Sequence, residues 1–210
     1  MGEHPKTHDA RGPDLQHTSS QCATRILLVR HGRAGKKADW RASDELRPLD
    51  RYGRDQAQWL VGPLTAMSPG RILSSPYLRC RQSVEPLAEK LGLLLELSHE
   101  LVPESGGRCC ELINRLSRAS SSEVCVVCTH GETLGFVLGR LVAEGGVRLV
   151  RSPPGAKACI WTLSFVHGEL ASVGYQAPPQ WTREGRRDDA AVATKHCRGS
   201  RTANRLTDSV

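Results

Sequence analysis

Apolar and polar positions along the middle of the chain follow two different periods. Short, nearly continuous apolar runs, as in residues 25–30 and 123–129, are typical of strands buried on both faces of a sheet. Between such runs, apolar residues recur every three or four positions, which indicates amphipathic helices. The predicted strands lie at 25–30, 71–74, 93–97 and 123–129, and the predicted helices at 53–64, 82–91, 109–119 and 133–143. Two further strands, 158–166 and 169–175, meet at His167-Gly168 and predict a hairpin.

The order of these elements predicts the fold class. Strands that alternate with helices usually form a mostly parallel sheet with helices on both faces. We therefore predict an α/β fold, a three-layer α/β/α sandwich with a mostly parallel sheet and a C-terminal hairpin. In such sheets a ligand binds beyond the carboxyl ends of the strands.

The two ends of the chain lack this periodicity. Residues 1–24 are polar and contain no periodic apolar face, and residues 176–210 contain one Leu, no Ile and no Phe. Such segments cannot bury enough apolar surface to offset the entropy that ordering costs. We expect a disordered N-terminal tail at 1–24, one domain at 25–175, and a basic, disordered C-terminal tail at 176–210.

The composition narrows the setting of this domain. The chain has 210 residues, of which 39% are hydrophobic and 24% charged. Its longest strongly apolar stretches, 26–29 and 91–97, are far shorter than the ~20 residues of a membrane-spanning helix. No apolar signal segment is visible at the N-terminus, and eight Cys residues are too few for a disulfide scaffold. We expect a cytoplasmic protein with reduced thiols and no membrane partner.

The net charge of +7 leaves two classes of partner open. Nucleic-acid-binding proteins combine basic clusters with aromatic side chains on which bases stack, but only 4% of this chain is aromatic. An anionic small substrate explains the charge equally well. Nucleic-acid binding through the basic tail is therefore an alternative that we do not favour.

Two His-Gly pairs follow predicted strands. His31-Gly32 follows the strand that ends at Arg30, and His130-Gly131 follows the fourth strand. Because the carboxyl ends of parallel strands meet at one edge, both histidines are expected in the same crevice. A glycine after each histidine permits a tight turn and the close approach of a ligand oxygen. For either pair alone, a structural histidine hydrogen-bonded near a turn is the alternative.

A third element leads to the same edge. Residues 74–83 (SSPYLRCRQS) follow the second strand and begin a helix that carries Arg79 and, as a further candidate, Arg81. Arg30 and Arg79 would flank His31 with two planar groups suited to bidentate phosphate binding. An imidazole nucleophile between fixed guanidinium groups predicts phosphoryl transfer for which a metal is not obligatory.

Two further motifs are assigned no functional role. Cys125 and Cys128 form a C-x-x-C within a predicted strand, where residues three apart point to opposite faces, so we predict neither a metal site nor a redox pair. His167-Gly168-Glu169 repeats the letters of residues 130–132 but lies at the hairpin turn.

The strand-RHG signature at 28–32 (LVRHG), the SSPYLRCRQS segment and the later THG, in this order, resemble the histidine phosphatase (phosphoglycerate mutase-like) superfamily. The resemblance covers about residues 25–175. Only about 50 residues separate Arg79 from His130, which is similar to the short phosphohistidine phosphatase (SixA-like) branch. Segments 47–50 and 85–88 are also similar to the phosphatase-like half of actinobacterial MutT-type hydrolases, although the chain has no Nudix box.

The resemblance implies a role for each residue of these motifs. His31 would accept the phosphoryl group as a phosphohistidine, and Arg30 and Arg79 would clamp the phosphate. His130 would stabilise charge on the transferring group. The implied phosphate-binding residues are Arg30, Gly32, Arg79, His130 and Gly131.

The chain departs from the family pattern at two places. The family usually carries a Glu after the third strand that protonates the leaving oxygen; Glu104 is the candidate here and Glu100 the alternative, and some short members lack this acid. Many relatives also carry a Ser or Thr and an Asn after RHG, where this chain has 33–37 (RAGKK). These basic residues would either replace the phosphate contacts or form a solvated loop.

The predicted function follows from this set. We predict a metal-independent phosphatase, rather than a mutase, that needs no cofactor and acts through a phosphohistidine on His31. Its partner would be a phosphorylated small molecule or a phosphoprotein, so that the substrate is a phosphomonoester or a protein phosphohistidine. The alternative is a regulatory module of the same fold that binds phosphate with weak or no turnover.

Overall fold

The computed structural model describes residues 23–119, 123–145, 149, 155–180 and 195–198. The strands are β1 (Ala23–Arg30), β2 (Arg71–Ser74), β3 (Leu95–Leu97), β4 (Val124–Thr129), β5 (Ile160–Val166), β6 (Glu169–Gln176) and β7 (Lys195–Arg198). The helices are α1 (Arg51–Thr65), α2 (Leu78–Leu91), α3 (Gly106–Ser117) and α4 (Gly131–Gly145). Three short 3-10 helices lie between them: η1 (Lys37–Asp39), η2 (Asp44–Leu46) and η3 (His99–Leu101).

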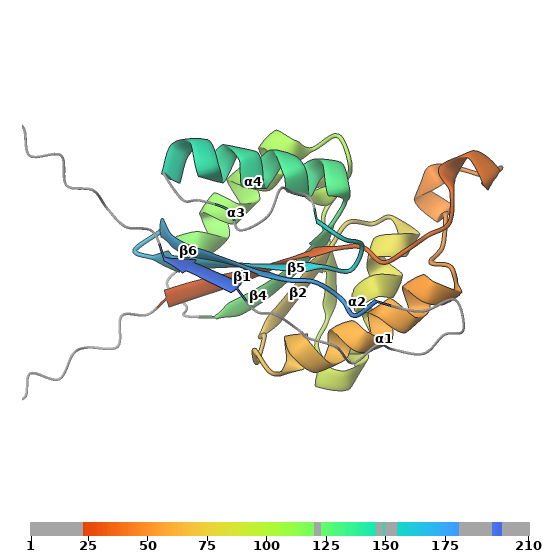
Figure 1. Cartoon of the computed structure of the whole chain (residues 1–210), viewed down its shortest axis with the longest axis horizontal. Helices are drawn as coiled ribbons and strands as arrows, with labels where there is room; N and C mark the ends of the chain where they lie inside the picture. The colour runs from red at the N-terminus through yellow and green to blue at the C-terminus, as the bar shows by residue number, and fades with distance from the viewer. Residues whose placement is uncertain (1–22, 120–122, 146–148, 150–154, 181–194, 199–210) are drawn as a thin grey trace, which may run out of the picture.

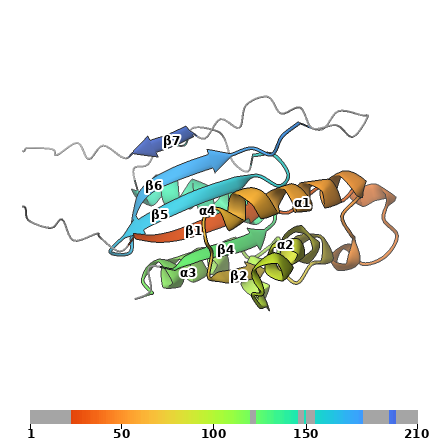
Figure 2. The same ribbon diagram turned by 90° about the horizontal axis from the view of Figure 1, so that it is seen from below.

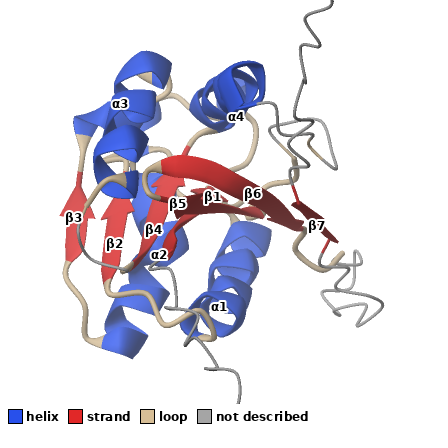
Figure 3. Cartoon of the chain, turned by 90° about the vertical axis from the view of Figure 1, so that its left-hand side faces the viewer, coloured by secondary structure: helices blue, strands red, loops and turns tan. Residues whose placement is uncertain are grey.

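One sheet joins all these strands in the order β3-β2-β4-β1-β5-β6-β7. The pairings among β3, β2, β4 and β1 are parallel, whereas β5, β6 and β7 add an antiparallel half. Helices α1 and α2 cover one face of the sheet, and α3 and α4 cover the other (Figure 1, Figure 3). The predicted three-layer α/β/α sandwich with a C-terminal hairpin is confirmed.

The C-terminal strand β7 is an element that the periodicity did not predict. It lies within the segment 176–210 and pairs with β6 in antiparallel register, at the edge of the sheet (Figure 2). The N-terminal strand β1 also begins two residues before the predicted domain boundary, at Ala23. Residues 1–22 and most of 181–210 lie outside the described residues, so disorder in the tails stays a prediction.

The central strand β1 explains why its sequence is a continuous apolar run. Ile26 and Leu28 pack in the core cluster that contains α3 and α4, whereas Leu27 and Val29 pack in the cluster that contains α1 and α2. All four side chains are fully buried because helices cover both faces of the sheet. On β4, Cys125 belongs to the first cluster and Cys128 to the second, as predicted for a C-x-x-C in a strand.

Backbone hydrogen bonds hold the residues that follow the parallel strands at one edge. The amide of His31 donates to the carbonyl oxygen of Thr129 over 3.0 Å, and the amide of Ser75 donates to that of Cys128 over 3.0 Å. The ladder therefore continues one residue past β1 and β2, which places His31, Ser75 and His130 on rigid elements.

The described residues also bear on the setting of the protein. Six of their cysteines, Cys80, Cys109, Cys110, Cys125, Cys128 and Cys159, are free thiols and are buried. None of the described helices combines the length and the apolar character that crossing a membrane requires. The cytoplasmic location stays a prediction.

The first turn of α1 packs directly on the loop that follows β1. The side chain of Asp50 accepts a hydrogen bond from the amide of Gly53 over 2.8 Å, and the amide of Asp50 donates to the carbonyl oxygen of Arg33 over 3.0 Å. A Cβ on Gly53 would overlap that same carbonyl oxygen. Gly53 is therefore required by the contact between α1 and the loop that carries His31.

We predict that Gly53→Ala destabilises the protein, because neither backbone can move away without breaking the helix cap. The expected loss is at the upper end of roughly 1–3 kcal/mol, measured by urea unfolding followed by circular dichroism. Gly139→Ala, at an exposed and open position of α4, is the matched control and should gain about 0.5–1 kcal/mol. Equal effects of the two substitutions would contradict this interpretation of Gly53.

Candidate active site

His31 follows β1 directly and is held in one orientation. Its Nδ1 lies 2.7 Å from the carbonyl oxygen of Gly32, and only 3% of the residue is exposed. A carbonyl oxygen can only accept, so Nδ1 carries the proton, and in the neutral ring Nε2 keeps its lone pair. The Nζ atom of Lys157 lies 3.2 Å from this Nε2. The nitrogen of His31 that carries the lone pair therefore faces Lys157 rather than the backbone.

The surroundings of His31 favour the neutral ring. Burial lowers its pKa well below 6.5, and the positive charges of Lys157, His130 and Arg79 lower it further. Only the hydrogen bond to the Gly32 carbonyl acts in the opposite direction. The imidazole is thus an unprotonated base, and a potential nucleophile, at neutral pH.

His130 follows β4 and meets His31 across the edge of the sheet. The two ring centroids are 5.3 Å apart at 62°, and His130 is fully buried. Its Nδ1 accepts a hydrogen bond from Arg79 over 3.1 Å, because a guanidinium group can only donate. In the neutral ring Nε2 then donates to Oγ of Ser75 over 2.9 Å. The two predicted histidines therefore lie together, each with a defined tautomer.

Arg79 lies in the first turn of α2 and is held by η2. It donates to the backbone oxygen of Asp44 over 2.7 Å and to its carboxylate over 3.1 Å. The same carboxylate accepts from Nε of Arg47 over 2.7 Å. Although burial alone would raise the pKa of Asp44, the bond from Arg47 and the charge of Arg79 lower it below its ordinary value. Asp44 is thus an ionised anchor for two arginines.

The second predicted phosphate ligand, Arg30, is the last residue of β1 and directly precedes His31. Its NH1 donates to the carbonyl oxygen of Gly155 over 2.6 Å. The Nε atoms of both Arg30 and Arg79 are buried and have no hydrogen-bond partner among the described residues. Each guanidinium group therefore keeps an N–H donor for an anion.

The two predicted glycines, Gly32 and Gly131, are required for the close approach of neighbouring groups and not for a turn. Neither Gly32 nor Gly131 has a positive φ. A Cβ on Gly131 would approach the guanidinium of Arg30 to 2.7–2.9 Å, and one on Gly32 would lie 3.0 Å from the carbonyl oxygen of Gly53. Gly131 thus admits the side chain of Arg30, and Gly32 admits α1.

Of the two predicted acids, one is engaged elsewhere. The carboxylate of Glu100 pairs with Arg115 of α3 at 2.8–2.9 Å. Glu104 is exposed and lies near Tyr77, whose pKa is raised by burial and by the negative charge of Glu104. The ring of Tyr77 in turn meets that of His130 at 4.8 Å. Glu104 is therefore near the site, beside Tyr77.

The segment after RHG does not turn all its charge toward the histidines. Arg33 pairs with Asp50 at 2.8 Å, and its guanidinium lies over the ring of Tyr52 at 4.7 Å. Its side chain is more than half exposed and joins the loop to α1. For Arg33 the structure favours the solvated loop over a replacement phosphate contact.

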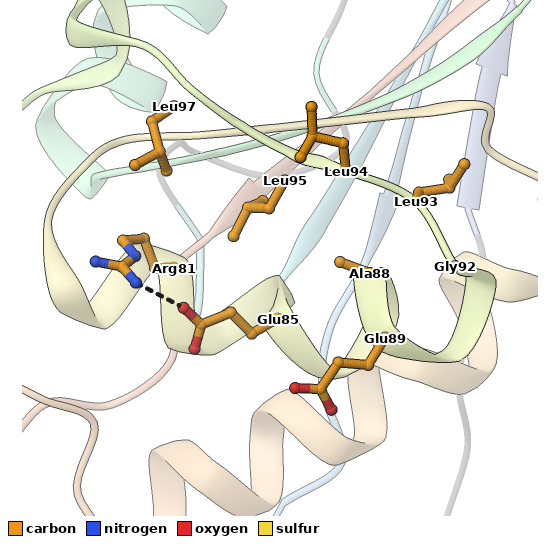
Figure 4. A pocket seen from close by; sticks show the side chains of 9 residues that line it. All are labelled: Arg81, Glu85, Ala88, Glu89, Gly92, Leu93, Leu94, Leu95 and Leu97. Atoms are coloured by element: carbon orange, nitrogen blue, oxygen red, sulfur yellow. Dashed lines mark ion pairs between the residues drawn. The ribbon is translucent and has the colours of Figure 1, made fainter.

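Arg81 points away from the two histidines. It pairs with Glu85 one turn later at 3.3 Å (Figure 4). Both line a groove of about 410 Å³ between α2 and β3, together with Ala88, Glu89, Gly92, Leu93, Leu94, Leu95 and Leu97. None of these nine residues is among the implied phosphate ligands, and Arg81, the further candidate for the same edge of the sheet, lies in this groove.

Three site residues were not predicted: Asp44, Arg47 and Lys157. Asp44 and Arg47 come from the loop between β1 and α1, where no periodicity marks a position. Lys157 comes from the loop before β5, more than 120 residues from His31 in the chain. Asp44 could have been predicted from its charge, because the buried guanidinium groups of Arg47 and Arg79 require a carboxylate between them.

The comparisons with known proteins agree with this geometry. The family model of the Histidine phosphatase superfamily (branch 1) matches residues 26–104. The chain is also 30% identical over 125 residues to phosphohistidine phosphatase SixA of Escherichia coli (strain K12), covering 55% of this chain and 73% of that protein. The chain belongs to the histidine phosphatase superfamily, in its SixA-like branch.

Another relative is the 8-oxo-(d)GTP phosphatase of Mycolicibacterium smegmatis (strain ATCC 700084 / mc(2)155), 31% identical over 160 residues. The match covers 73% of this chain, which spans about half (48%) of that relative. The structure of SixA complexed with tungstate is similar at a TM-score of 0.58 and 24% identity, over 70% of this chain and 92% of that chain. A mycobacterial glucosyl-3-phosphoglycerate phosphatase is similar at a TM-score of 0.53 and 18% identity, over 68% and 90%. These two structures share the fold.

The lowered pKa of His31 predicts how stability depends on pH. Below 6.5 the unfolded chain binds a proton at this residue while the folded state does not, so the free energy of unfolding falls as the pH falls. His31→Gln should flatten the acid limb of a plot of unfolding free energy against pH, measured in urea. His167→Asn, at the exposed hairpin turn, should leave that limb as in the wild type. A steeper limb in His31→Gln would contradict a neutral His31.

Proposed function

We propose that this protein is a metal-independent phosphatase that acts through a phosphohistidine on His31. The observation that carries the proposal is the orientation of the ring: the Gly32 carbonyl holds the proton on Nδ1, so that Nε2 keeps its lone pair and lies 3.2 Å from Nζ of Lys157, in a site that also contains His130 and Arg79. The family assignment and the relatives named as phosphatases support the same enzyme class.

The proposed reaction has two displacements at phosphorus. In the first, the lone pair of Nε2 forms the N–P bond, and the bond from phosphorus to the leaving oxygen breaks. In the second, a water oxygen attacks phosphorus, the N–P bond breaks, and the electron pair returns to Nε2. The buried Nε donors of Arg30 and Arg79 would bind the phosphoryl oxygens, and their charges would offset the developing negative charge.

We propose a phosphomonoester or a protein phosphohistidine as the substrate. The relatives are named for phosphohistidine, for 8-oxo-(d)GTP and for glucosyl-3-phosphoglycerate, so the leaving group differs among them while the transferred phosphoryl group is common. The partner is accordingly a phosphorylated small molecule or a phosphoprotein. Glu104, which the resemblance implies as the donor of a proton to the leaving oxygen, lies beside Tyr77.

A second candidate function is a module that binds phosphate without turnover. It is favoured by the engagement of Arg79, whose NH1 and NH2 groups are already bound by Asp44 and His130. In this alternative the site would hold an anion on the free Nε atoms, and Asp44 would keep Arg79 from following a phosphoryl group through the reaction.

Labelling separates the two candidates. Radiolabelled phosphoramidate should leave an acid-labile, base-stable label on the wild-type protein and none on His31→Ala, because His31 supplies the accepting nitrogen. His167→Asn, in the second His-Gly-Glu triplet, is the matched control and should label as the wild type does. A label that persists in His31→Ala would rule out the proposed nucleophile. Saturable binding of inorganic phosphate, with neither label nor product from any aryl phosphate, would establish the binding module instead.

We further predict that Arg79→Lys lowers kcat/KM for p-nitrophenyl phosphate about 100-fold or more, since an ammonium cannot reproduce the donors that the guanidinium directs at the site and at His130. Arg81→Lys, two residues along the same helix but in the groove with Glu85, should stay within about twofold of the wild type. Initial rates for the two variants test this directly. Equal losses in both would mean that α2, rather than the Arg79 side chain, accounts for the effect.

A further inference from the structure

The loop before β5 is bound tightly to the RHG segment. The amide of Ala158 donates to the carbonyl oxygens of Arg30 (3.0 Å) and His31 (3.2 Å). The amide of Arg30 donates to the carbonyl oxygen of Cys159 over 3.1 Å, and its side chain donates to that of Gly155 over 2.6 Å. Residues 155–159 therefore move with the nucleophile and not as a free surface loop.

This loop holds an unfavourable backbone conformation next to Lys157. Ala158 has a φ of 59° although it is an alanine, and it is fully buried. Non-glycine residues adopt this left-handed conformation at a cost, and such residues gather at functional sites, where the surroundings enforce them. The conformation directs the chain so that Lys157, one residue earlier, reaches His31.

Nζ of Lys157 lies next to Nε2 of His31, the proposed nucleophilic atom. The distance from Nζ to Nε2 of His31 is 3.2 Å. The charged groups that act on Lys157 are Arg30, Arg79 and Arg47, which are positive, and Glu132 in the first turn of α4, which is negative. Burial and the neighbouring arginines lower the pKa of Lys157 to about 8, against the opposing effect of Glu132. Lys157 is thus protonated at neutral pH and gives up its proton far more readily than an ordinary lysine.

We propose that Lys157 is a catalytic acid and base of this site, donating a proton to the leaving oxygen in place of a carboxylic acid. The proposal rests on the proposed function, in which His31 accepts the phosphoryl group. In an in-line displacement the leaving oxygen lies on the side of phosphorus away from Nε2, so Nζ of Lys157 must move from Nε2 to that oxygen when the substrate binds, and the flexible four-carbon stem of lysine permits this movement.

Protons and electrons balance in both steps. As the N–P bond forms on His31, the P–O bond breaks, and its electron pair stays on the leaving oxygen. One N–H proton of Lys157 moves to that oxygen, which leaves as a hydroxyl group, and Lys157 becomes a neutral amine. In the second step the amine takes a proton from the attacking water, whose oxygen bonds to phosphorus while the N–P bond breaks. Lys157 and His31 both return to their starting states.

The carboxylates near the site are less suited to this role. Glu100 is bound by Arg115. The pKa of Glu132 is lowered by a hydrogen bond from its own backbone N–H and by the charges of His130, Lys157 and Arg30, although partial burial opposes them. The carboxylate of Glu132 therefore holds no proton to donate at neutral pH. Glu104 is exposed beside Tyr77, whereas Lys157 contacts the nucleophile itself.

The test compares two leaving groups in purified full-length protein. Phenyl phosphate releases a phenol with a pKa near that of tyrosine, about 10, and p-nitrophenyl phosphate releases a much less basic phenolate that needs little protonation. Lys157→Met should lower kcat for phenyl phosphate about 100-fold or more, and should lower kcat for p-nitrophenyl phosphate far less. The wild-type kcat should fall as the pH rises through about 8, where Lys157 loses its proton, and Lys157→Met should lack this alkaline limb. Lys157→Arg, which keeps the charge but cannot release a proton, should show the same leaving-group dependence.

Two further variants complete the design. Lys90→Met, at an exposed position in the last turn of α2, is the matched control and should behave as the wild type. Glu104→Gln should lower the rates for the two substrates by the same factor, if it lowers them at all. A loss in Glu104→Gln that grows with the basicity of the leaving group would assign the acid to Glu104 and overturn the proposal.

Other results would also overturn it. Equal losses for both substrates in Lys157→Met, or recovery of activity in Lys157→Arg, would make Lys157 a ligand of the phosphate and not an acid. Phosphoramidate separates this failure from failure of the proposed function, because its leaving nitrogen carries its own protons. Lys157→Met should still form the label on His31 if His31 is the nucleophile, whereas a wild-type protein without that label would refute the function itself.

Discussion

Repulsion between cations is the constraint on which the whole site depends. Arg30, Arg47, Arg79 and Lys157 all act on one small, largely buried space, where a low dielectric strengthens their repulsion. The fold offsets this repulsion with two ionised carboxylates, those of Asp44 and Glu132, and with a set of main-chain carbonyl oxygens. Each histidine ring has a fixed hydrogen-bonding pattern: Nδ1 of His31 donates to the Gly32 carbonyl, and Nδ1 of His130 accepts from Arg79. A dianion that enters this space relieves the repulsion, and the site is therefore electrostatically suited to a phosphate before any substrate contact is made.

The acceptors also explain why the site draws on segments far apart in the chain. Each guanidinium group is bound to a main-chain carbonyl in a segment that connects the strands and the α-helices: Arg79 to that of Asp44, Arg47 to that of Ala34, and Arg30 to that of Gly155. The parallel strands place the two histidines, and the arginines then order the loops around them. Rigid strands and ordered loops are thus parts of one hydrogen-bonded unit, which is why a change at Gly53, on α1, bears on the same structure.

The helices and buried strands, whose apolar residues recur at regular intervals, could be predicted from the sequence. The features that depend on single contacts could not. Because β1 is buried on both faces, its sequence is a continuous apolar run that can be recognised as a strand. Because β1 and β4 are parallel, the residues that follow them, His31 and His130, are expected side by side, as they are in the structure. Asp44 and Lys157 lie in loops whose paths are set by hydrogen bonds to distant carbonyls, and such bonds leave no periodic signal. The same holds for β7, whose four residues pair through their backbone and need no apolar pattern to do so.

The attachment of residues 155–159 to β1 has a consequence for how members of such a fold diverge. The proposed phosphate ligands Arg30 and Arg79 lie on β1 and α2, within the region matched by the family model, whereas Lys157 lies in the segment before β5, beyond that region. Because the backbone bonds of Ala158 involve no side chain, residue 157 can be exchanged while the loop keeps its path. A substitution at residue 157 can therefore change the proposed acid while the proposed phosphate ligands on β1 and α2 stay in place.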